Sequence, residues 1–423
     1  MSNTEQFQTI SMIGLGYIGL PTAAMFAARR KKVIGVDINK HAVDTINQGR
    51  IHIVEPELDM IVHSAVNEGF LRATTRPEPA DAFLIAVPTP FKGDHEPDVS
   101  YVQAAAESIA PVLQAGNLVV LESTSPVGTT EQLVSWLAAA RPDLRFPVEG
   151  QAEIDVNVAY CPERVLPGHV VRELVENDRI IGGLSPACSE RAVELYRTFV
   201  QGELLVTNAR TAEMCKLTEN SFRDVNIAFA NELSVICDKL DISVWELIKL
   251  ANRHPRVNIL TPGAGVGGHC IAVDPWFIVD KTPDQARLIR TARVVNDDKP
   301  QWVIGKVMEA IRAKTQSGRK AEDLTVALMG LAFKPNIDDL RESPALHIVE
   351  ALVPSLKSRF MIVEPNVEVP PRSLNDHRLS TTEAALAAAD IVVLLVAHKE
   401  FADIGDKLRG DQIAIDAVGL LSR

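Results

Sequence analysis

Short apolar runs rich in β-branched residues alternate with stretches of helical periodicity over about the first two hundred residues. Runs of strand length lie at 9–13, 32–37, 82–87, 118–122, 157–161 and 179–182, and helical patterns between them cover 20–30, 101–113 and 130–139. Strands that alternate with helices in this way build βαβ units and a mainly parallel sheet. The pattern therefore predicts an α/β domain of the Rossmann type at 1–205.

The pattern changes near Thr211, where thirty residues without Gly or Pro carry apolar positions three and four apart. This spacing predicts one long helix, and helical patterns continue to about 298, so we assign 206–300 to a central helical domain. After a polar connector at 313–323, strand-like runs return as TVALMGLAF, RFMIVEP, DIVVLLVA and QIAIDAVG. These runs predict a smaller, Rossmann-like α/β domain at 301–423. The fold class is α/β, with a helical connector between two sheets.

Charge, apolar run length and cysteine spacing argue against nucleic acid, a membrane span and a metal site. Lysine plus arginine (43) against aspartate plus glutamate (55) leave a net charge of −12 without a long basic run, so we expect no nucleic acid. The N-terminus lacks the basic segment of a signal peptide, and the longest apolar runs have strand length, so we expect no membrane span. The five cysteines are too widely spaced for a zinc or redox pair, which favours a reducing cytoplasm and no metal.

A glycine motif near the N-terminus has the full context of a dinucleotide-binding turn. Gly14, Gly16 and Gly19 follow the first predicted strand and open the first helix. Gly14 permits a tight turn, Gly16 lets the backbone approach a pyrophosphate, and Gly19 lets the helix pack on the strand. Asp37, at the end of the second strand, can accept hydrogen bonds from a ribose, which favours NAD over NADP. The alternative is a glycine turn without a ligand.

A second run with the same glycine spacing has a different meaning. Gly263, Gly265 and Gly268 follow a proline rather than a strand, and Pro275 restricts the residue before it, so no regular helix opens directly after the glycines. The run therefore fails as a second dinucleotide motif. Its glycines instead leave room for a ligand beside Cys270, which we interpret as a candidate nucleophile.

Each residue near this loop also has a structural interpretation. A cysteine is usually a small buried hydrophobe, as we expect for Cys188 and Cys237. Asp274 precedes a proline and can cap a helix, a role that can coexist with a catalytic one. His269 adjoins Cys270, but adjacent side chains in extended backbone point to opposite faces, so we assign it no proton transfer.

Three polar residues share one face of the predicted long helix. Lys216, Asn220 and Arg223 stand at i, i+4 and i+7. This face is either a solvated stripe or one wall of an active site, and the spacing favours neither. In the second case Lys216 can stabilise charge that develops on an alcohol oxygen during hydride loss.

The chain resembles the UDP-glucose/GDP-mannose dehydrogenase family over essentially its whole length. The resemblance is carried by IGLGYIGLP, VPTPF, ESTSPVG, CPERVLPG, KLTENSFRDVNIAFANE, NRHPRVNILTPGAGVGGHCIAVDP and AFKPNIDDLRESPA. It implies an N-terminal Rossmann domain that binds NAD, a long central helix used in dimerisation, and a C-terminal Rossmann-like domain that binds UDP. It also implies a cytoplasmic homodimer that serves cell-surface polysaccharide biosynthesis.

The resemblance assigns roles position by position. It implies Cys270 as the nucleophile and Lys216 as proton donor or acceptor, while Asn220 and Asp274 position a substrate oxygen or water. Glu163 and Thr124 match positions that support a hydrolytic step, and Arg256 reaches into the neighbouring subunit. The implied substrate-binding residues are Arg164, Val165, Lys216, Asn220, Arg223, His254, Arg256, Gly267, Lys334 and Arg341. The implied cofactor-binding residues are Gly14, Gly16, Tyr17, Ile18, Gly19, Asp37, Thr89 and Thr130.

Two departures from the UDP-glucose enzymes point to another sugar. Those enzymes carry serine where His269 stands and lysine where Val273 stands. We therefore expect a UDP-N-acetylhexosamine substrate, UDP-N-acetyl-D-mannosamine first, with UDP-N-acetyl-D-glucosamine as the alternative. Oxidation of its primary alcohol to a carboxylate removes four electrons, so two NAD are reduced while the cysteine holds the sugar as a thiohemiacetal and then a thioester.

Other functions compete with this one. A two-electron dehydrogenase of the β-hydroxyacid kind shares the Rossmann domain and the helical segment, but it gives no role to Cys270 or to the second α/β domain. A short-chain reductase or epimerase needs Tyr-x-x-x-Lys, which none of the four tyrosines provides. A non-catalytic NAD- or nucleotide-sugar-binding protein would show damage at Lys216, Cys270 or Asp274, and all three are present.

Overall fold

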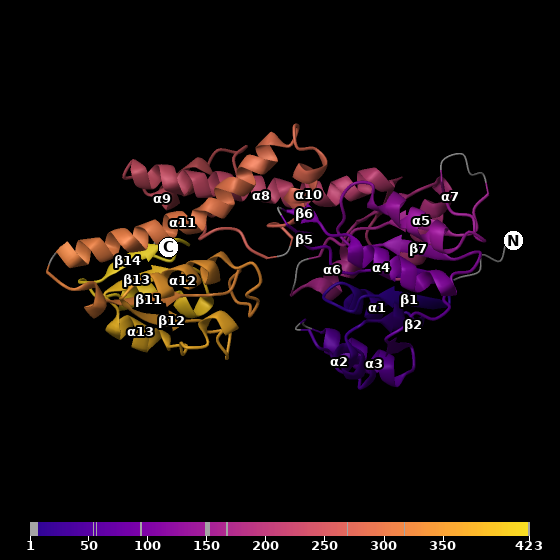
Figure 1. The fold of residues 1–423 in the computed structure, drawn as a ribbon, viewed down its shortest axis with the longest axis horizontal. Coiled ribbons are helices and arrows are strands. Elements are labelled where there is room, and N and C mark those ends of the chain that lie inside the picture. Colours follow the sequence, from indigo (N-terminus) through magenta and orange to yellow (C-terminus); the bar gives the residue numbers. More distant parts are fainter. Residues whose placement is uncertain are drawn as a thin grey trace. The chain divides into compact units, whose positions relative to one another are not determined.

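The computed structural model describes residues 7–53, 55, 57–93, 95–148, 153–165, 168–268, 270–316 and 318–421. His269 lies outside the described residues. The chain forms two compact units, unit 1 (Met1–Glu219) and unit 2 (Asn220–Arg423), whose elements are labelled in Figure 1. Within the described ranges, every helix is too short or too polar to cross a lipid bilayer.

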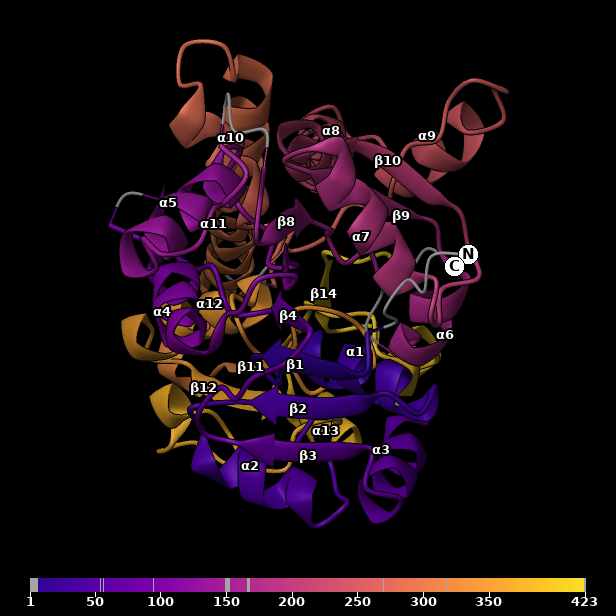
Figure 2. The ribbon, with the colours of Figure 1, turned by 90° about the vertical axis from the view of Figure 1, so that its right-hand side faces the viewer.

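In the described part of unit 1, eight strands form a sheet in the order β10-β9-β8-β7-β4-β1-β2-β3. Figure 2 shows β1, β2 and β3 side by side. All neighbouring pairs are parallel except β8 and β9, which are antiparallel. The strands are β1 (Thr9–Ile13), β2 (Lys32–Val36), β3 (Leu71–Thr74), β4 (Ala82–Ile85), β7 (Leu118–Leu121), β8 (Asn157–Tyr160), β9 (Arg179–Gly183) and β10 (Leu204–Asn208). The small hairpin of β5 (Phe91–Lys92) and β6 (Glu96–Pro97) stands apart.

Helices cover both faces of this sheet, because its central strands are apolar on both sides. One core lies under α1, α2, α3, α6 and α7, and the other lies under α4 and α5. The predicted α/β architecture is confirmed. The sequence analysis named no element at α2, α3, α6, α7, β3 or β10, nor at the hairpin of β5 and β6. The helices are α1 (Gly19–Ala28), α2 (Lys40–Asn47), α3 (Leu58–Asn67), α4 (Ser100–Ile109), η1 (Ala110–Val112), α5 (Thr129–Ala140), α6 (Val170–Glu176) and α7 (Pro186–Tyr196).

The predicted long helix is α8 (Ala209–Lys239), which begins slightly earlier than its apolar periodicity indicated. It is followed by α9 (Val244–Ala251), α10 (Asp274–Lys281) and α11 (Arg287–Gln316). The helix α11 contains Pro300 and ends at Gln316. The connector predicted at 313–323 therefore begins too early, because its first four residues belong to α11. Ala, Lys and Gln there are good helix formers, and polarity does not end a helix whose surface faces water.

Among the described residues of unit 2, four parallel strands form the sheet β12-β11-β13-β14, as the apolar runs predicted. Its core lies between this sheet and the helices α11, α12 and α13. The strands are β11 (Thr325–Met329), β12 (Arg359–Val363), β13 (Ile391–Leu394) and β14 (Ile413–Asp416). The helices are η2 (Ala321–Asp323), α12 (Pro344–Ser355), η3 (Arg372–Leu374), α13 (Thr382–Ala388), η4 (Lys399–Phe401) and α14 (Ile404–Lys407).

Candidate active site

The N-terminal glycines meet the geometric requirements of a dinucleotide-binding turn. Gly14 has a φ of 93°, and a Cβ there would lie 2.4 Å from the carbonyl oxygen of Ala86. A Cβ on Gly19 would lie 1.8 Å from the carbonyl oxygen of Gly14, so α1 can approach β1 only with glycine at this position. A Cβ on Gly16 would meet nothing within 4 Å. Gly16 therefore faces open space, which fits a pyrophosphate at the start of α1.

Asp37 lies beside this turn, directly after β2. One carboxylate oxygen accepts a hydrogen bond from the backbone N–H of Leu15 at 2.9 Å, and the other accepts from the N–H of Asn39 at 2.8 Å. These bonds fix the carboxylate next to the glycine turn, where a ribose of NAD would be recognised. Tyr17 is partly exposed, and Ile18 stands at the N-cap of α1.

Three threonines of the predicted site lie near the carboxyl end of β7. The hydroxyl of Thr89 donates to the carbonyl oxygen of Thr124 at 2.6 Å, so the structure brings these two residues together. Thr130 is buried, and both its hydroxyl and its N–H donate to one carboxylate oxygen of Glu213 on α8. The N–H of Gly128 donates to the other oxygen at 2.6 Å. Glu213, which the sequence gave no reason to select, thus holds the start of α5.

Glu163 follows β8 and is buried with both carboxylate oxygens engaged. Arg179 on β9 donates to Oε2 at 2.8 Å, and the N–H of Arg164 donates to Oε1 at 2.7 Å. The Arg179 side chain is 4% exposed, and its guanidinium lies over the rings of Tyr196 and Phe199. Arg179 therefore fixes the orientation of the Glu163 carboxylate.

A second carboxylate lies in the same buried cluster. Glu122, directly after β7, accepts a hydrogen bond from the hydroxyl of Tyr196 at 2.6 Å. Complete burial raises the pKa of Glu122 to about 7, although the charge of Arg179 acts in the opposite direction. Burial also raises the pKa of the neighbouring Cys161 thiol to about 12, so that cysteine is not a nucleophile at neutral pH. Sequence reasoning selected only Glu163 from this cluster.

Other predicted residues of unit 1 lie on the adjoining surface. Arg164 forms an ion pair with Glu219 of α8 at 2.7 Å, and both side chains are partly exposed. Val165 is also partly buried. Lys216 is partly buried on α8, one helical turn before Glu219 and Asn220. The face of α8 predicted to carry functional residues is therefore neither fully solvated nor fully buried in unit 1.

In unit 2 the structure joins Asn220 to Asp274. The Asn220 amide donates to Oδ2 of Asp274 at 2.5 Å, and both side chains are buried. The backbone N–H of Asp274 also donates to the carbonyl oxygen of Cys270 at 2.8 Å. The N-cap interpretation of Asp274 is wrong, because α10 begins at Asp274 and Val273 occupies the N-cap position. The Asp274 carboxylate is thus bonded to Asn220 of α8.

The glycines before Cys270 allow another segment of unit 2 to pack against the loop. A Cβ on Gly267 would lie 2.3 Å from the carbonyl oxygen of Glu342, and one on Gly268 would lie 2.9 Å from the ring of Phe333. A Cβ on Gly265 would lie 2.8 Å from Pro344. Cys270 itself is exposed, whereas Cys161, Cys188 and Cys237 are buried. The predicted assignment of Cys188 and Cys237 to the core is confirmed.

The segment that packs on these glycines carries the predicted residues Lys334 and Arg341. Arg341 forms a two-pronged ion pair with Asp339, and its side chain is half-exposed. A buried carboxylate, Glu364, accepts the N–H groups of Leu331 and Ala332 at the start of this segment. Arg223, His254 and Arg256 are exposed, so their side chains are accessible to a ligand.

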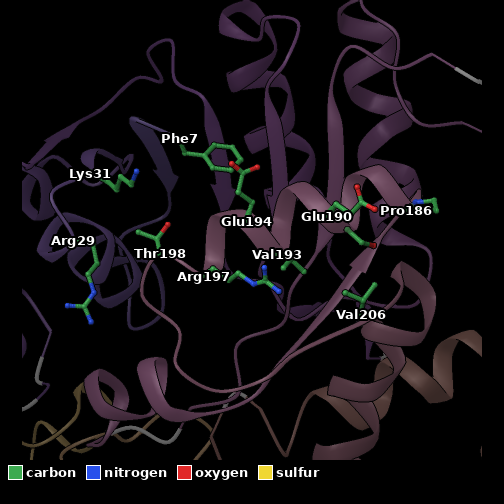
Figure 3. A pocket seen from close by; sticks show the side chains of 11 residues that line it. Phe7, Arg29, Lys31, Pro186, Glu190, Val193, Glu194, Arg197, Thr198 and Val206 are labelled. Atoms are coloured by element: carbon green, nitrogen blue, oxygen red, sulfur yellow. The ribbon is translucent and has the colours of Figure 1, made fainter. Parts of the chain in front are cut away.

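A cavity of about 920 Å³ lies elsewhere in unit 1 (Figure 3). Both basic and acidic side chains line it, among them Arg29, Arg197, Glu190 and Glu194. None of the predicted catalytic, cofactor-binding or substrate-binding residues lines it. Its position between the end of α1 and α7 separates it from the glycine turn that begins α1.

The parallel sheet, the glycine turn and Asp37 define unit 1 as an NAD-binding domain of the Rossmann type. Comparison with known proteins narrows this class. Residues 8–200, 210–298 and 327–423 match the NAD-binding, central and UDP-binding domains of the UDP-glucose/GDP-mannose dehydrogenase family. The chain belongs to this family and is an NAD-dependent nucleotide-sugar dehydrogenase.

Curated relatives are similar over nearly the full length. An NDP-N-acetyl-D-galactosaminuronic acid dehydrogenase from Ralstonia nicotianae is 63% identical over 98% of this chain and 97% of its own. A UDP-N-acetyl-D-mannosamine dehydrogenase from Salmonella typhi is also 63% identical, over 98% of this chain and 99% of its own. The structure of UDP-D-ManNAc dehydrogenase from Pyrococcus horikoshii is 40% identical, covers 97% of this chain and 96% of its own, and has a TM-score of 0.87.

Proposed function

We propose that the protein oxidises UDP-N-acetyl-D-mannosamine to UDP-N-acetyl-D-mannosaminuronate with two NAD. The observation that carries this proposal is the exposed Cys270, whose backbone is bonded to Asp274 while Asp274 is held by Asn220. A simple alcohol dehydrogenase needs no such thiol, whereas in an enzyme that carries an aldehyde on to an acid a thiol can hold the aldehyde covalently between the two oxidations. Relatives named for this mannosamine substrate support the choice of sugar.

The first oxidation yields an aldehyde. NAD held at the glycine turn and Asp37 would supply the hydride acceptor for each of the two oxidations. We assign the hydroxyl proton of the alcohol to Lys216, which then returns it to the oxygen as the Cys270 thiolate adds to the aldehyde carbon. The new C–S bond gives a thiohemiacetal that cannot leave the site. The exposed position of Cys270 fits this addition, because the thiol must reach a carbon of the substrate.

The second oxidation gives a thioester, which water hydrolyses. As the second hydride leaves, Lys216 takes the hydroxyl proton. Asp274 and Asn220 position the water, and Glu163 with Thr124 supports its deprotonation. Attack on the thioester carbon breaks the C–S bond, so the Cys270 thiolate is released. In sum, one alcohol, one water and two NAD give one carboxylate, two NADH and three protons.

Binding follows the proposed division of the chain, with NAD at 1–205, a helical connector at 206–300 and UDP at 301–423. Arginines and lysines meet the diphosphate locally, which offsets the net charge of −12. The proposed cofactor-binding residues are Gly14, Gly16, Tyr17, Ile18, Gly19, Asp37, Thr89 and Thr130. The proposed substrate-binding residues are Arg164, Val165, Lys216, Asn220, Arg223, His254, Arg256, Gly267, Lys334 and Arg341.

The decisive measurement is the ratio of NADH formed to sugar consumed. We expect a ratio of two and a uronic acid product identified by mass, whereas a ratio of one would contradict the four-electron reaction. The Cys270→Ala variant should form no acid while it still binds NAD. The matched control Cys237→Ala changes a buried cysteine of the same unit and should retain the ratio of two.

A second candidate substrate is UDP-N-acetyl-D-galactosamine. A relative named for N-acetyl-D-galactosaminuronic acid is as similar to this chain as the mannosamine enzymes, at 63% identity. A panel of the UDP-linked N-acetylated mannosamine, galactosamine and glucosamine therefore tests the choice. The sugar with the highest kcat/KM identifies the substrate.

We further propose that two copies associate through α8. Phe222, Phe229 and Ile236 recur every seven residues on this helix, and their side chains are 68%, 54% and 44% exposed. An exposed apolar stripe of this kind is typical of a helix that packs against a partner. The proposed compartment is the cytoplasm, since a thiolate nucleophile at Cys270 requires reducing surroundings. Light scattering should show a dimer, and Phe229→Glu should give a monomer.

A further inference from the structure

A chain of buried side-chain hydrogen bonds connects α8 and α11 to the beginning of the Cys270 loop. Oδ1 of Asn231 on α8 accepts the backbone N–H of Gly263 at 2.9 Å. The Asn231 amide donates to Oδ1 of Asn296 on α11 at 2.9 Å, and the Asn296 amide donates to Oδ1 of Asp224 at 2.8 Å. Asp224 also accepts from Arg293 at 2.6 Å. These four residues are at most 1% exposed.

The groups at the two ends of this chain, the N–H of Gly263 and the carboxylate of Asp224, determine which atom of each asparagine donates and which accepts. A backbone N–H can only donate, so the Asn231 atom that faces Gly263 must be its oxygen. The Asp224 carboxylate accepts from Arg293 and from the Asn296 amide, so the oxygen of Asn296 is the atom left to face Asn231. Asn231 must therefore accept at Gly263 and donate at Asn296. Neither aspartate in its ionised form nor alanine can do both.

The loop from Gly263 to Asp274 is thus held at both ends by α8. At its start Asn231 holds the N–H of Gly263, and at its end Asn220 holds the carboxylate of Asp274. Between these bonds the glycines give the loop little intrinsic stiffness. Without the first bond, packing is what restrains the beginning of the loop: Ala264 lies in the core of unit 2, and the glycines pack against Pro300 and residues 333–344.

We propose that Asn231 is a positioning residue, which fixes the Cys270 loop through Gly263 without touching the substrate. This inference rests on the proposed function in one respect, the role of Cys270 as nucleophile. The attack of a thiolate on an aldehyde depends on placement to within about 1 Å, and a displacement of that size costs up to ~100-fold in rate. Asn231 therefore acts on kcat, while NAD binding in unit 1 is independent of it.

The test is Asn231→Asp, which preserves shape and one acceptor but removes the donor to Asn296 when the new carboxyl is ionised. Protonation restores a donor, so the deficit in kcat should shrink as the pH falls. The charged groups that border this position are Asp224 on α8 and Arg293 and Lys299 on α11. Lys299 reaches Asn231 through Ser234, whose hydroxyl donates to the Asn231 carbonyl oxygen at 2.6 Å.

With UDP-N-acetyl-D-mannosamine and NAD at neutral pH, kcat should fall at least ~tenfold, with the KM for NAD within about twofold of the wild-type value. Hydrogen exchange of peptides from 263–274 should become faster, and the rate at which iodoacetamide labels Cys270 should change. The control Asn117→Asp alters another buried asparagine, which accepts the N–H of Gln114 at 2.8 Å in unit 1, and should leave the loop unchanged.

Faster exchange of the loop together with a kcat deficit that narrows at low pH supports the assignment. Unchanged exchange, or a wild-type kcat in Asn231→Asp, overturns it. A deficit equal at all pH values also overturns it, since a general loss of structure does not recover on protonation. If the wild-type chain reduces no NAD with any UDP-sugar, the proposed function fails instead, and loop exchange with Cys270 labelling decides the role of Asn231.

Discussion

The buried Glu122 makes a specific prediction about stability and pH. Its carboxyl is completely buried, and burial raises its pKa from 4.5 to about 7. The variant Glu122→Gln preserves the shape of the side chain and an oxygen that accepts the Tyr196 hydroxyl, but it cannot ionise. The difference in free energy of unfolding between the two proteins therefore isolates the ionisation of one group.

The sign follows from proton binding. Because folding raises the pKa of this acid, the folded chain binds more protons than the unfolded chain between about pH 4.5 and pH 7. The free energy of unfolding of the wild type therefore falls as the pH rises through this window, and the loss is complete above pH 7. With a pKa of 4.5 in the unfolded chain and about 7 in the folded chain, the free energy of unfolding of the wild type falls by ~2.5 kcal/mol between about pH 5 and pH 8. Glu122→Gln should not show this decrease, because glutamine does not ionise.

Hydrogen exchange of peptides from β7 and β8 in increasing urea measures this quantity in unit 1. The free energy of unfolding of Glu122→Gln minus that of the wild type should be ~2.5 kcal/mol larger at about pH 8 than at pH 5. Any cost of the buried amide is the same at both pH values and cancels. Ser135→Ala, which removes an exposed hydroxyl and no titratable group, is the control. An equal difference at both pH values would refute the assignment of a raised pKa to Glu122.

Three further predictions concern the site itself. Gly267→Ala should lower kcat/KM for the UDP-sugar by at least ~tenfold, because a Cβ at this position would lie 2.3 Å from the carbonyl oxygen of Glu342. The control is Gly305→Ala in α11, where a Cβ would meet no atom within 4 Å. This control should leave the melting temperature unchanged or raise it. Arg179→Lys should slow thioester hydrolysis more than the first hydride transfer in single-turnover kinetics, since it weakens the hold on Glu163. Asp37→Ala should raise the KM for NAD about tenfold with little change in the KM for the sugar, as steady-state assays can show.

Much of the fold follows from local pattern. The predicted strands at 9–13 and 179–182 begin at the residues where β1 and β9 begin, because buried parallel strands are continuous apolar runs. The predicted strands that ended at Asp37, Glu122 and Cys161 each extend one residue too far. These residues lie at the carboxyl ends of strands, where the chain leaves the sheet. Asp37 is partly exposed there, whereas Glu122 and Cys161 are buried.

The parts that could not be predicted depend on distant residues. Asn231 and Asn296 are 65 residues apart, and Glu122 and Tyr196 are 74 apart, so no local periodicity connects them. Each of these residues is unremarkable by itself, and its role arises from a buried partner on another element. The purpose of the glycines before Cys270 also depended on a distant segment, because their Cβ positions are blocked by residues 333–344.

The two Rossmann-like sheets share the same turn after their first strand, but the acid that accepts its N–H groups has a different role in each. In each, a glycine with positive φ follows the first strand and donates to the last residue of the next strand, Gly14 to Val36 and Gly330 to Val363, both at 2.8 Å. In each, the following N–H donates to the acid after that strand, Asp37 or Glu364. Asp37 is partly exposed, whereas Glu364 is buried.

Glu364 differs from Asp37 because a buried histidine, His398, contacts its carboxylate. His398 is buried against Glu364, with Nε2 3.1 Å from Oε2, and its Nδ1 accepts the N–H of Asn336 at 3.0 Å. Glu364 is thus engaged within the protein and cannot bind a ribose as Asp37 can. Glu364 instead holds the beginning of the turn 331–336 at Leu331, and His398 holds its end at Asn336; this turn carries Lys334. An acid after the second strand therefore indicates a dinucleotide site only where its carboxylate remains accessible.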